Sequence, residues 1–264
     1  MNINSKIVLN EFYKEIYYIL KKTDPEVTEV WAEISETSFL NKCTISEIGD
    51  FLTNFDFASL QKGNYQHYII INKILFIIHA INALALDIRT LSELIDYNAF
   101  EGLISEILCK NNYKTIKNFR FSDRSNFKST TAQKKYEIDI IGIYSKYVLL
   151  IDAKQWKRKD SFSAINKAAD LQYRRALALK KNPEIFSKII QKLIGININV
   201  KKRLPLSLIP MMVTLEDNSY KINSNQIPLV SIYELNSFLN ELNRNLIYFR
   251  IVKVGKLGIQ KTLC

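Results

Sequence analysis

Cysteine and histidine are scarce in this chain of 264 residues, which contains three Cys and two His. Cys43, Cys109 and Cys264 are far apart and form no CxxC or other zinc-binding spacing. A disulfide framework and a cysteine–histidine metal site are therefore not expected. Free thiols in a reducing cytoplasm are the expectation instead.

The sequence also lacks the motifs of several common enzyme classes. No GxxxxGK phosphate-binding loop, GxSxG nucleophile elbow or HExxH metal motif occurs. The first residues, MNINSKIVLNEF, contain no apolar core of a signal peptide. Tyr68–Leu86 is long and apolar, but polar residues such as Lys73 and His79 interrupt it. It predicts a buried helix rather than a membrane span, so we expect a cytoplasmic protein without a membrane partner.

Charge is abundant but unevenly distributed. The formal net charge is +11, with −7 in residues 1–109, +12 in residues 110–181 and +6 in residues 182–264. A strongly basic segment favours an acidic partner, of which DNA is the one we expect. The acidic first part predicts a different role, such as binding a protein partner, forming a homodimer or assisting recognition.

Apolar spacing predicts that residues 1–96 form an all-helical N-terminal region. Ser46–Asn54 or Thr90–Asp96 fits a helix-turn-helix, although the acidic surroundings would repel phosphates. Packing or partner contact is the alternative for these segments. The helices are expected at Lys6–Lys22, Pro25–Leu40, Ile45–Leu60, Tyr65–Asp87 and Thr90–Ile95.

Residues 97–264 are predicted to form an α/β domain with a mixed sheet flanked by helices. Helices are expected at Phe100–Cys109, at Ser163–Lys181 with a continuation to Ile194, and after a capping box at Ser231–Glu234. Strands are expected at Tyr113–Phe121, Tyr136–Tyr144, Tyr147–Trp156, Leu206–Leu215, Pro228–Ile232 and Leu246–Val254.

The residues that suggest a catalytic function lie in the stretch YEIDIIGIYSKYVLLIDAKQW (136–156). If Ser145–Lys146 is a two-residue hairpin turn, Asp139 lies opposite Asp152 with side chains about 5 Å apart on one face. Two carboxylates so placed repel each other unless a cation lies between them. A hard divalent ion such as Mg²⁺ suits them, because it prefers oxygen ligands.

The same register places Glu137 opposite Lys154. A lysine beside a bound Mg²⁺ can orient an attacking water and offset the charge that grows on a phosphate. A hairpin held by salt bridges is the alternative. It explains Glu137 with Lys154 but not Asp139 opposite Asp152.

The order Asp139, then Asp152-Ala153-Lys154 at the end of an apolar strand, resembles the PD-(D/E)XK nuclease superfamily. FEGLISEILCKNNYKTI (100–116) resembles the helix that opens Mrr-like restriction endonucleases and archaeal Holliday-junction resolvases. The resemblance covers roughly residues 97–232. It implies a restriction-endonuclease-like fold and a DNA substrate, with Mg²⁺ as the cofactor or Mn²⁺ in its place. The implied metal ligands are Asp139, Asp152 and the Ala153 carbonyl, and Lys154 would position water.

Glu101 and Gln172 are further catalytic candidates. Glu101 lies about 90° from the centre of the apolar face of its helix, where the resemblance implies an acidic metal ligand. An ordinary first-turn glutamate is the alternative. Gln172 lies within the apolar stripe of Ser163–Lys181, where the resemblance implies a glutamine near the catalytic centre. A hydrogen-bonded core glutamine is equally compatible with this position.

Basic residues flank the candidate site in sequence and could neutralise phosphates on both sides of a scissile bond. Trp156 could stack on a base, with core packing as the alternative. The sequence thus predicts an endonuclease that cuts DNA in restriction, defence, repair or recombination. The alternative is a nuclease-like module that binds nucleic acid without cutting it. The nucleic-acid-binding candidates are Lys128, Lys134, Lys135, Trp156, Lys157, Arg158, Lys159, Arg174 and Arg175.

Overall fold

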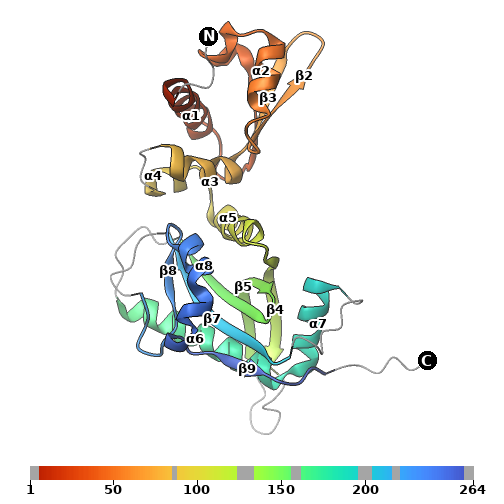
Figure 1. The fold of residues 1–264 in the computed structure, drawn as a ribbon, viewed down its shortest axis with the longest axis vertical. Helices are drawn as coiled ribbons and strands as arrows, with labels where there is room; N and C mark the ends of the chain where they lie inside the picture. Colours follow the sequence, from red (N-terminus) through yellow and green to blue (C-terminus); the bar gives the residue numbers. More distant parts are fainter. Residues whose placement is uncertain are drawn as a thin grey trace, which may run out of the picture. The chain divides into compact units, whose positions relative to one another are not determined.

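The computed structural model describes residues 6–84, 88–123, 134–155, 162–195, 204–215 and 221–258. The chain divides into two compact units, Met1–Glu106 (unit 1) and Ile107–Cys264 (unit 2). The boundary falls within helix α5 (Tyr97–Lys110), which is labelled in Figure 1. No helix in the described part of the chain is long and apolar enough to cross a membrane.

Unit 1 combines helices with a three-stranded sheet, in which β3 lies between β1 and β2 and is antiparallel to both. Its core is aromatic, since the buried rings of Phe12, Phe51, Phe57 and Phe76 pack against one another. The helices are α1 (Lys6–Lys21), α2 (Ile45–Leu52), α3 (Lys73–Ala83) and α4 (Ile88–Ser92), and the strands are β1 (Glu29–Glu33), β2 (Ala58–Lys62) and β3 (His67–Asn72).

The helical character expected of the first part is present, but the prediction that it is all-helical is wrong. The segments Pro25–Leu40 and Tyr65–Asp87 each contain a strand, and Ile45–Leu60 overlaps the first residues of β2. The strands contain only five or six residues each, and β3 passes directly into α3. Short apolar runs of this kind do not distinguish strand from helix by periodicity, which explains the error.

Unit 2 contains a six-stranded mixed sheet in the order β4-β5-β6-β7-β8, with β9 paired to β7. The sheet runs antiparallel from β4 to β6, and β7 is parallel to both β6 and β8. Flanking helices complete the α/β arrangement that the sequence predicted. The elements are β4 (Lys114–Asp123), β5 (Lys134–Tyr144), β6 (Tyr147–Lys154), α6 (Phe162–Lys181), α7 (Pro183–Ile194), β7 (Leu206–Thr214), β8 (Leu229–Ser231), α8 (Leu235–Asn245) and β9 (Val252–Val254).

Helix α6 covers the part of the sheet that carries the candidate site. Ala176 and Leu179 of α6 belong to one buried cluster with Val148 and Leu150 of β6. Because strand side chains alternate between faces, Asp152 lies on the same face of β6 as Leu150. The apolar contact between α6 and β6 therefore brings polar residues of α6 close to Asp152.

Candidate active site

The hairpin of β5 and β6 has the predicted register. Ser145 and Lys146 form the turn, and pairing runs without a shift from Tyr144–Tyr147 to Ile140–Ile151. The backbone ladder between the two strands ends there. Asp139 is the next residue of β5 toward the start of the strand. Its carboxylate Oδ2 accepts a hydrogen bond from the Ala153 N–H at 2.8 Å. A side chain thus takes over where the backbone pairing stops.

The strand β5 is irregular at Asp139. Asn118 of β4, which the register of the two strands would place opposite Asp139, has a φ of 54°. Ile138 and Ile141 both belong to the core cluster under α6 and α7, although strict alternation would put them on opposite faces. This irregularity is consistent with a carboxylate that turns toward the main chain of β6.

Asp139 and Asp152 interact electrostatically. Asp139 is buried, and burial raises the pKa of its carboxyl group, with the charge of Asp152 as the second cause. The Ala153 N–H and the charges of Lys154 and Arg175 act in the opposite direction on that pKa. The Ala153 nitrogen is bonded to the carbonyl carbon of Asp152, so the Asp139 carboxylate lies beside the main chain of Asp152.

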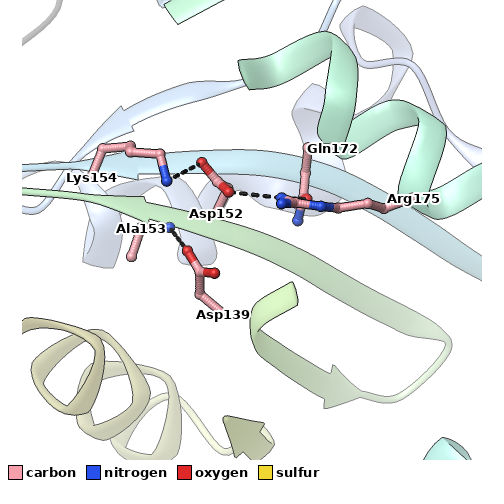
Figure 2. Close-up of polar contacts among 6 residues, drawn as sticks. All are labelled: Asp139, Asp152, Ala153, Lys154, Gln172 and Arg175. Atoms are coloured by element: carbon pink, nitrogen blue, oxygen red, sulfur yellow. Dashed lines mark hydrogen bonds and ion pairs between the residues drawn. The ribbon is translucent and has the colours of Figure 1, made fainter. Parts of the chain in front are cut away.

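Asp152 is a buried carboxylate between two cations. Its Oδ2 lies 2.9 Å from Lys154 Nζ, and its Oδ1 lies 2.7 Å from Arg175 Nη1. Figure 2 shows the carboxylate held from both sides in this way. The contact with Lys154 is an ion pair, and Oδ2 accepts no hydrogen bond from the described residues.

Gln172 reaches this cluster through Arg175, one turn further along α6 (Figure 2). The fully buried Gln172 accepts a hydrogen bond from Arg175 Nη1 at 2.7 Å, so one nitrogen of Arg175 donates to both Gln172 and Asp152. In the described part of the chain, Gln172 Nε2 and Arg175 Nε are buried donors without an acceptor. Unsatisfied buried groups are rare in folded proteins and often mark a place where a ligand or water binds.

Sequence reasoning missed the inward position of Arg175, which it treated as one of many flanking cations. The sequence did contain a signal for the inward position of Arg175. Gln172 lies in the apolar stripe of α6, and a residue three positions later lies on the same helix face. Arg174, its neighbour in sequence, is exposed as expected for a solvated cation.

The predicted pairing of Glu137 with Lys154 is wrong. Glu137 forms an ion pair with Arg120 of β4, with N–O distances of 3.0 and 2.9 Å, and Lys154 interacts with Asp152. The reason is that the β5–β6 ladder ends before Glu137, whereas the β4–β5 ladder continues and places Arg120 opposite it.

The remaining candidates are placed as follows. Glu101 is buried on α5 within unit 1, and its role as a metal ligand stays a prediction. Lys135 is exposed, and Lys134 begins β5. Cys43 and Cys109 are free thiols. Lys128, Trp156, Lys157, Arg158, Lys159 and Cys264 lie outside the described residues.

The donor set is compatible with Mg²⁺. Asp139 and Asp152 supply buried carboxylate oxygens, and Oδ2 of Asp152, which accepts no hydrogen bond from the described residues, already faces a cation, the Lys154 ammonium. No three His, Cys, Asp or Glu side chains of the described residues gather as a metal cluster. Mg²⁺ does not require such a cluster, because it is commonly held by one or two carboxylates together with waters and substrate phosphates.

Comparisons with known proteins do not identify the chain. No family model and no curated protein matches it. One solved structure, the crystal structure of protein VC1899 from Vibrio cholerae, aligns with 92% of this chain and 53% of that chain, at 11% identity and a TM-score of 0.34. This chain thus spans about half the length of that protein. A TM-score of 0.34 does not establish a common fold.

Proposed function

We propose that unit 2 is a Mg²⁺-dependent endonuclease of the PD-(D/E)XK type, with a restriction-endonuclease-like fold, that hydrolyses phosphodiester bonds of DNA. The observation that carries the proposal is the cluster at the end of the β5–β6 ladder. Two buried, mutually repelling carboxylates meet a lysine there, and within the described part of the chain one carboxylate oxygen accepts no hydrogen bond. A cluster of this composition has a cost for folding that a metal-dependent site explains.

Each residue of the cluster has a definite part in this mechanism. Asp139 and Asp152 would hold the ion, with the Ala153 carbonyl as a third oxygen. When bound, Mg²⁺ supplies the charge that polarises the phosphorus centre and lowers the pKa of an attacking water. Lys154 orients that water and offsets the negative charge that grows on the phosphate. Its side chain is partly exposed, at 23%.

The charge of unit 2 supports nucleic acid as the substrate. Residues 107–264 contain 29 Lys and Arg against 11 Asp and Glu. Such an excess attracts a polyanion and releases counterions when phosphates are neutralised. Exposed Lys135 and Arg174 are the described members of the proposed contact surface. The additional unit 1 leads us to favour an Mrr-like role in restriction or repair over a resolvase, because resolvases are usually compact single domains.

A binding module without catalysis is the second candidate. It is favoured by one observation, namely that Lys154 and Arg175 already neutralise Asp152 without any ion. In that case the cluster would stabilise a nuclease-like fold that holds nucleic acid.

A cleavage panel separates the two candidates. The substrates are plain, methylated and damaged duplexes and a four-way junction, each with Mg²⁺, Mn²⁺ or EDTA. The nuclease cuts at least one of them with a divalent ion and none with EDTA. Protein that binds these substrates but cuts none of them supports the binding module.

A further inference from the structure

We propose that Arg175 is the internal counter-cation of Asp152, which positions this carboxylate in the ion-free protein and competes with the divalent ion for it. The proposal rests on the proposed function, since it concerns the same carboxylate. It assigns Arg175 a positioning role within the site, instead of the contact with substrate phosphates expected from the sequence. The strength of ion binding would then be set by a residue outside the ligand set.

Short contacts hold the guanidinium group of Arg175 against the Asp152 carboxylate. Nη1 donates to Asp152 Oδ1 and to Gln172 Oε1, both at 2.7 Å. The side chain is 11% exposed, and that of Asp152 is 4% exposed. Gln172 is fully buried, so it provides a rigid acceptor that holds the guanidinium against the carboxylate. A charge-assisted hydrogen bond of this length is among the stronger polar contacts in proteins.

A permanent charge at this place opposes the binding of a second cation. A guanidinium does not lose its proton at physiological pH, so Arg175 cannot relieve the repulsion by becoming neutral. Asp152 has only two carboxylate oxygens, and Arg175 takes Oδ1 while Lys154 lies beside Oδ2. A divalent ion that binds Asp152 therefore meets positive charge on both sides of its ligand.

The same charge stabilises the protein before an ion arrives. Asp139 and Asp152 repel each other, and a buried carboxylate that loses its partner destabilises a fold strongly. Arg175 thus lowers the affinity of the site for the divalent ion and raises the stability of the ion-free protein. Removing the Arg175 charge should therefore raise the affinity for the ion and lower the stability of the ion-free protein.

Calorimetric titration of the full chain with Ca²⁺, without DNA, measures the competition directly. Arg175→Gln should tighten the dissociation constant for Ca²⁺ at least tenfold. Arg174→Gln is the matched control, since it removes the same charge from the exposed neighbouring position, and should change the constant less than twofold. Arg175→Lys keeps the charge and should stay within threefold of the unaltered protein.

Thermal unfolding provides the second readout. Without ion, Arg175→Gln should unfold at a lower temperature than Arg174→Gln, and saturating Ca²⁺ should recover more of the midpoint in Arg175→Gln. An Arg175→Gln protein that folds only with Ca²⁺ supports the proposal. A protein that stays unfolded with and without Ca²⁺ contradicts it.

The outcomes distinguish this inference from the proposed function. If the unaltered chain binds Ca²⁺, Asp152→Asn abolishes that binding and Arg175→Gln behaves like Arg174→Gln, the competition is refuted while the metal site stands. If neither the unaltered chain nor Arg175→Gln binds Ca²⁺ or Mn²⁺, the metal site and the competition fail together.

Discussion

Each unit buries a charged side chain, and the two charges are satisfied in different ways. In unit 1, Lys73 is fully buried and its ammonium donates to the main-chain carbonyls of Asp24 at 2.6 Å and Leu94 at 3.2 Å. In unit 2, Asp152 is paired with the cations Lys154 and Arg175, and among the described residues its Oδ2, Gln172 Nε2 and Arg175 Nε make no hydrogen bond. A buried ammonium that donates to main-chain carbonyls links separate segments of the fold. Unused donors and acceptors around a buried charge leave room for a ligand.

The charged residues of the sequence are also divided unequally between the two units. Residues 1–106 contain 8 Lys and Arg against 15 Asp and Glu, whereas residues 107–264 contain 29 against 11. The basic unit is thus the one that buries two carboxylates. This contrast is the reason why we propose that unit 2, and not unit 1, contacts DNA.

The largest expected effect is on catalysis. Lys154→Ala should lower the cleavage rate by about 10²–10³, because comparable electrostatic contacts to the transition state contribute that much. DNA affinity should change far less, since one lysine supplies a small part of the phosphate contacts. Single-turnover kinetics and a binding titration give the two quantities. Lys146→Ala, at the exposed turn of the same hairpin, is the control and should cut normally. Unchanged cleavage by Lys154→Ala would place the active site elsewhere.

A second prediction tests which of the two units contributes to DNA binding. The double substitution Lys135→Gln with Arg174→Gln should weaken DNA binding about tenfold and reduce the slope of log affinity against log salt by up to about 2. The matched pair Lys42→Gln with Lys62→Gln removes two exposed charges from unit 1. Fluorescence anisotropy over a salt series should find this pair close to the unaltered chain. A larger loss from the unit 1 pair would assign DNA binding to unit 1.

Lys73 provides a stability test in unit 1. Lys73→Met should lower the free energy of unfolding by about 1–3 kcal/mol, because the carbonyl groups of Asp24 and Leu94 lose their donor. Lys62→Met at an exposed position should stay within about 0.5 kcal/mol of the unaltered chain. Urea unfolding of both variants measures the difference. If Lys73→Met also abolished cleavage without unfolding, Lys73 would have more than a structural role.

The smallest expected effect concerns Asp139 in the absence of a divalent ion. Burial raises the pKa of this carboxyl group, so its favourable contribution is fully present below the unfolded-state pKa and is lost as pH rises through the folded-state pKa. Asp139→Asn removes this loss and should raise the melting temperature at neutral pH in EDTA. The gain should be a few degrees, at about 2–4 °C per kcal/mol for a domain of this size. The two melting curves should converge as the solution becomes acidic. A gain that persists unchanged at low pH would contradict the cause given for the shift.

Much of unit 2 could be predicted from the sequence because its signals are local. The strands β5 and β6 are long apolar runs joined by two residues, so one turn fixes the register from Tyr144 to Ile140. The same local geometry predicted that Asp139 and Asp152 would approach each other. Helix α6 was equally clear, since its apolar stripe extends over many residues.

The rest depended on contacts between distant segments. The register of β5 with β6 ends at Ile140 and Ile151, and only the path of β4 determines that Glu137 meets Arg120. The inward turn of Arg175 follows from the packing of α6 on β6. In the small sheet of unit 1, β1 pairs with β3 across some forty residues of sequence. No local pattern predicts that pairing.

The most direct measurement of the central claim is divalent-dependent cleavage by the unaltered chain and by Asp152→Asn, compared side by side. Labelled DNA is incubated with each protein in Mg²⁺, in Mn²⁺ and in EDTA, and the products are resolved on a gel. The account predicts cuts by the unaltered chain with either metal and none with EDTA. It also predicts no cuts by Asp152→Asn, although that variant still binds DNA. Equal cleavage by both proteins, or cleavage that continues in EDTA, would contradict a metal site at Asp139 and Asp152.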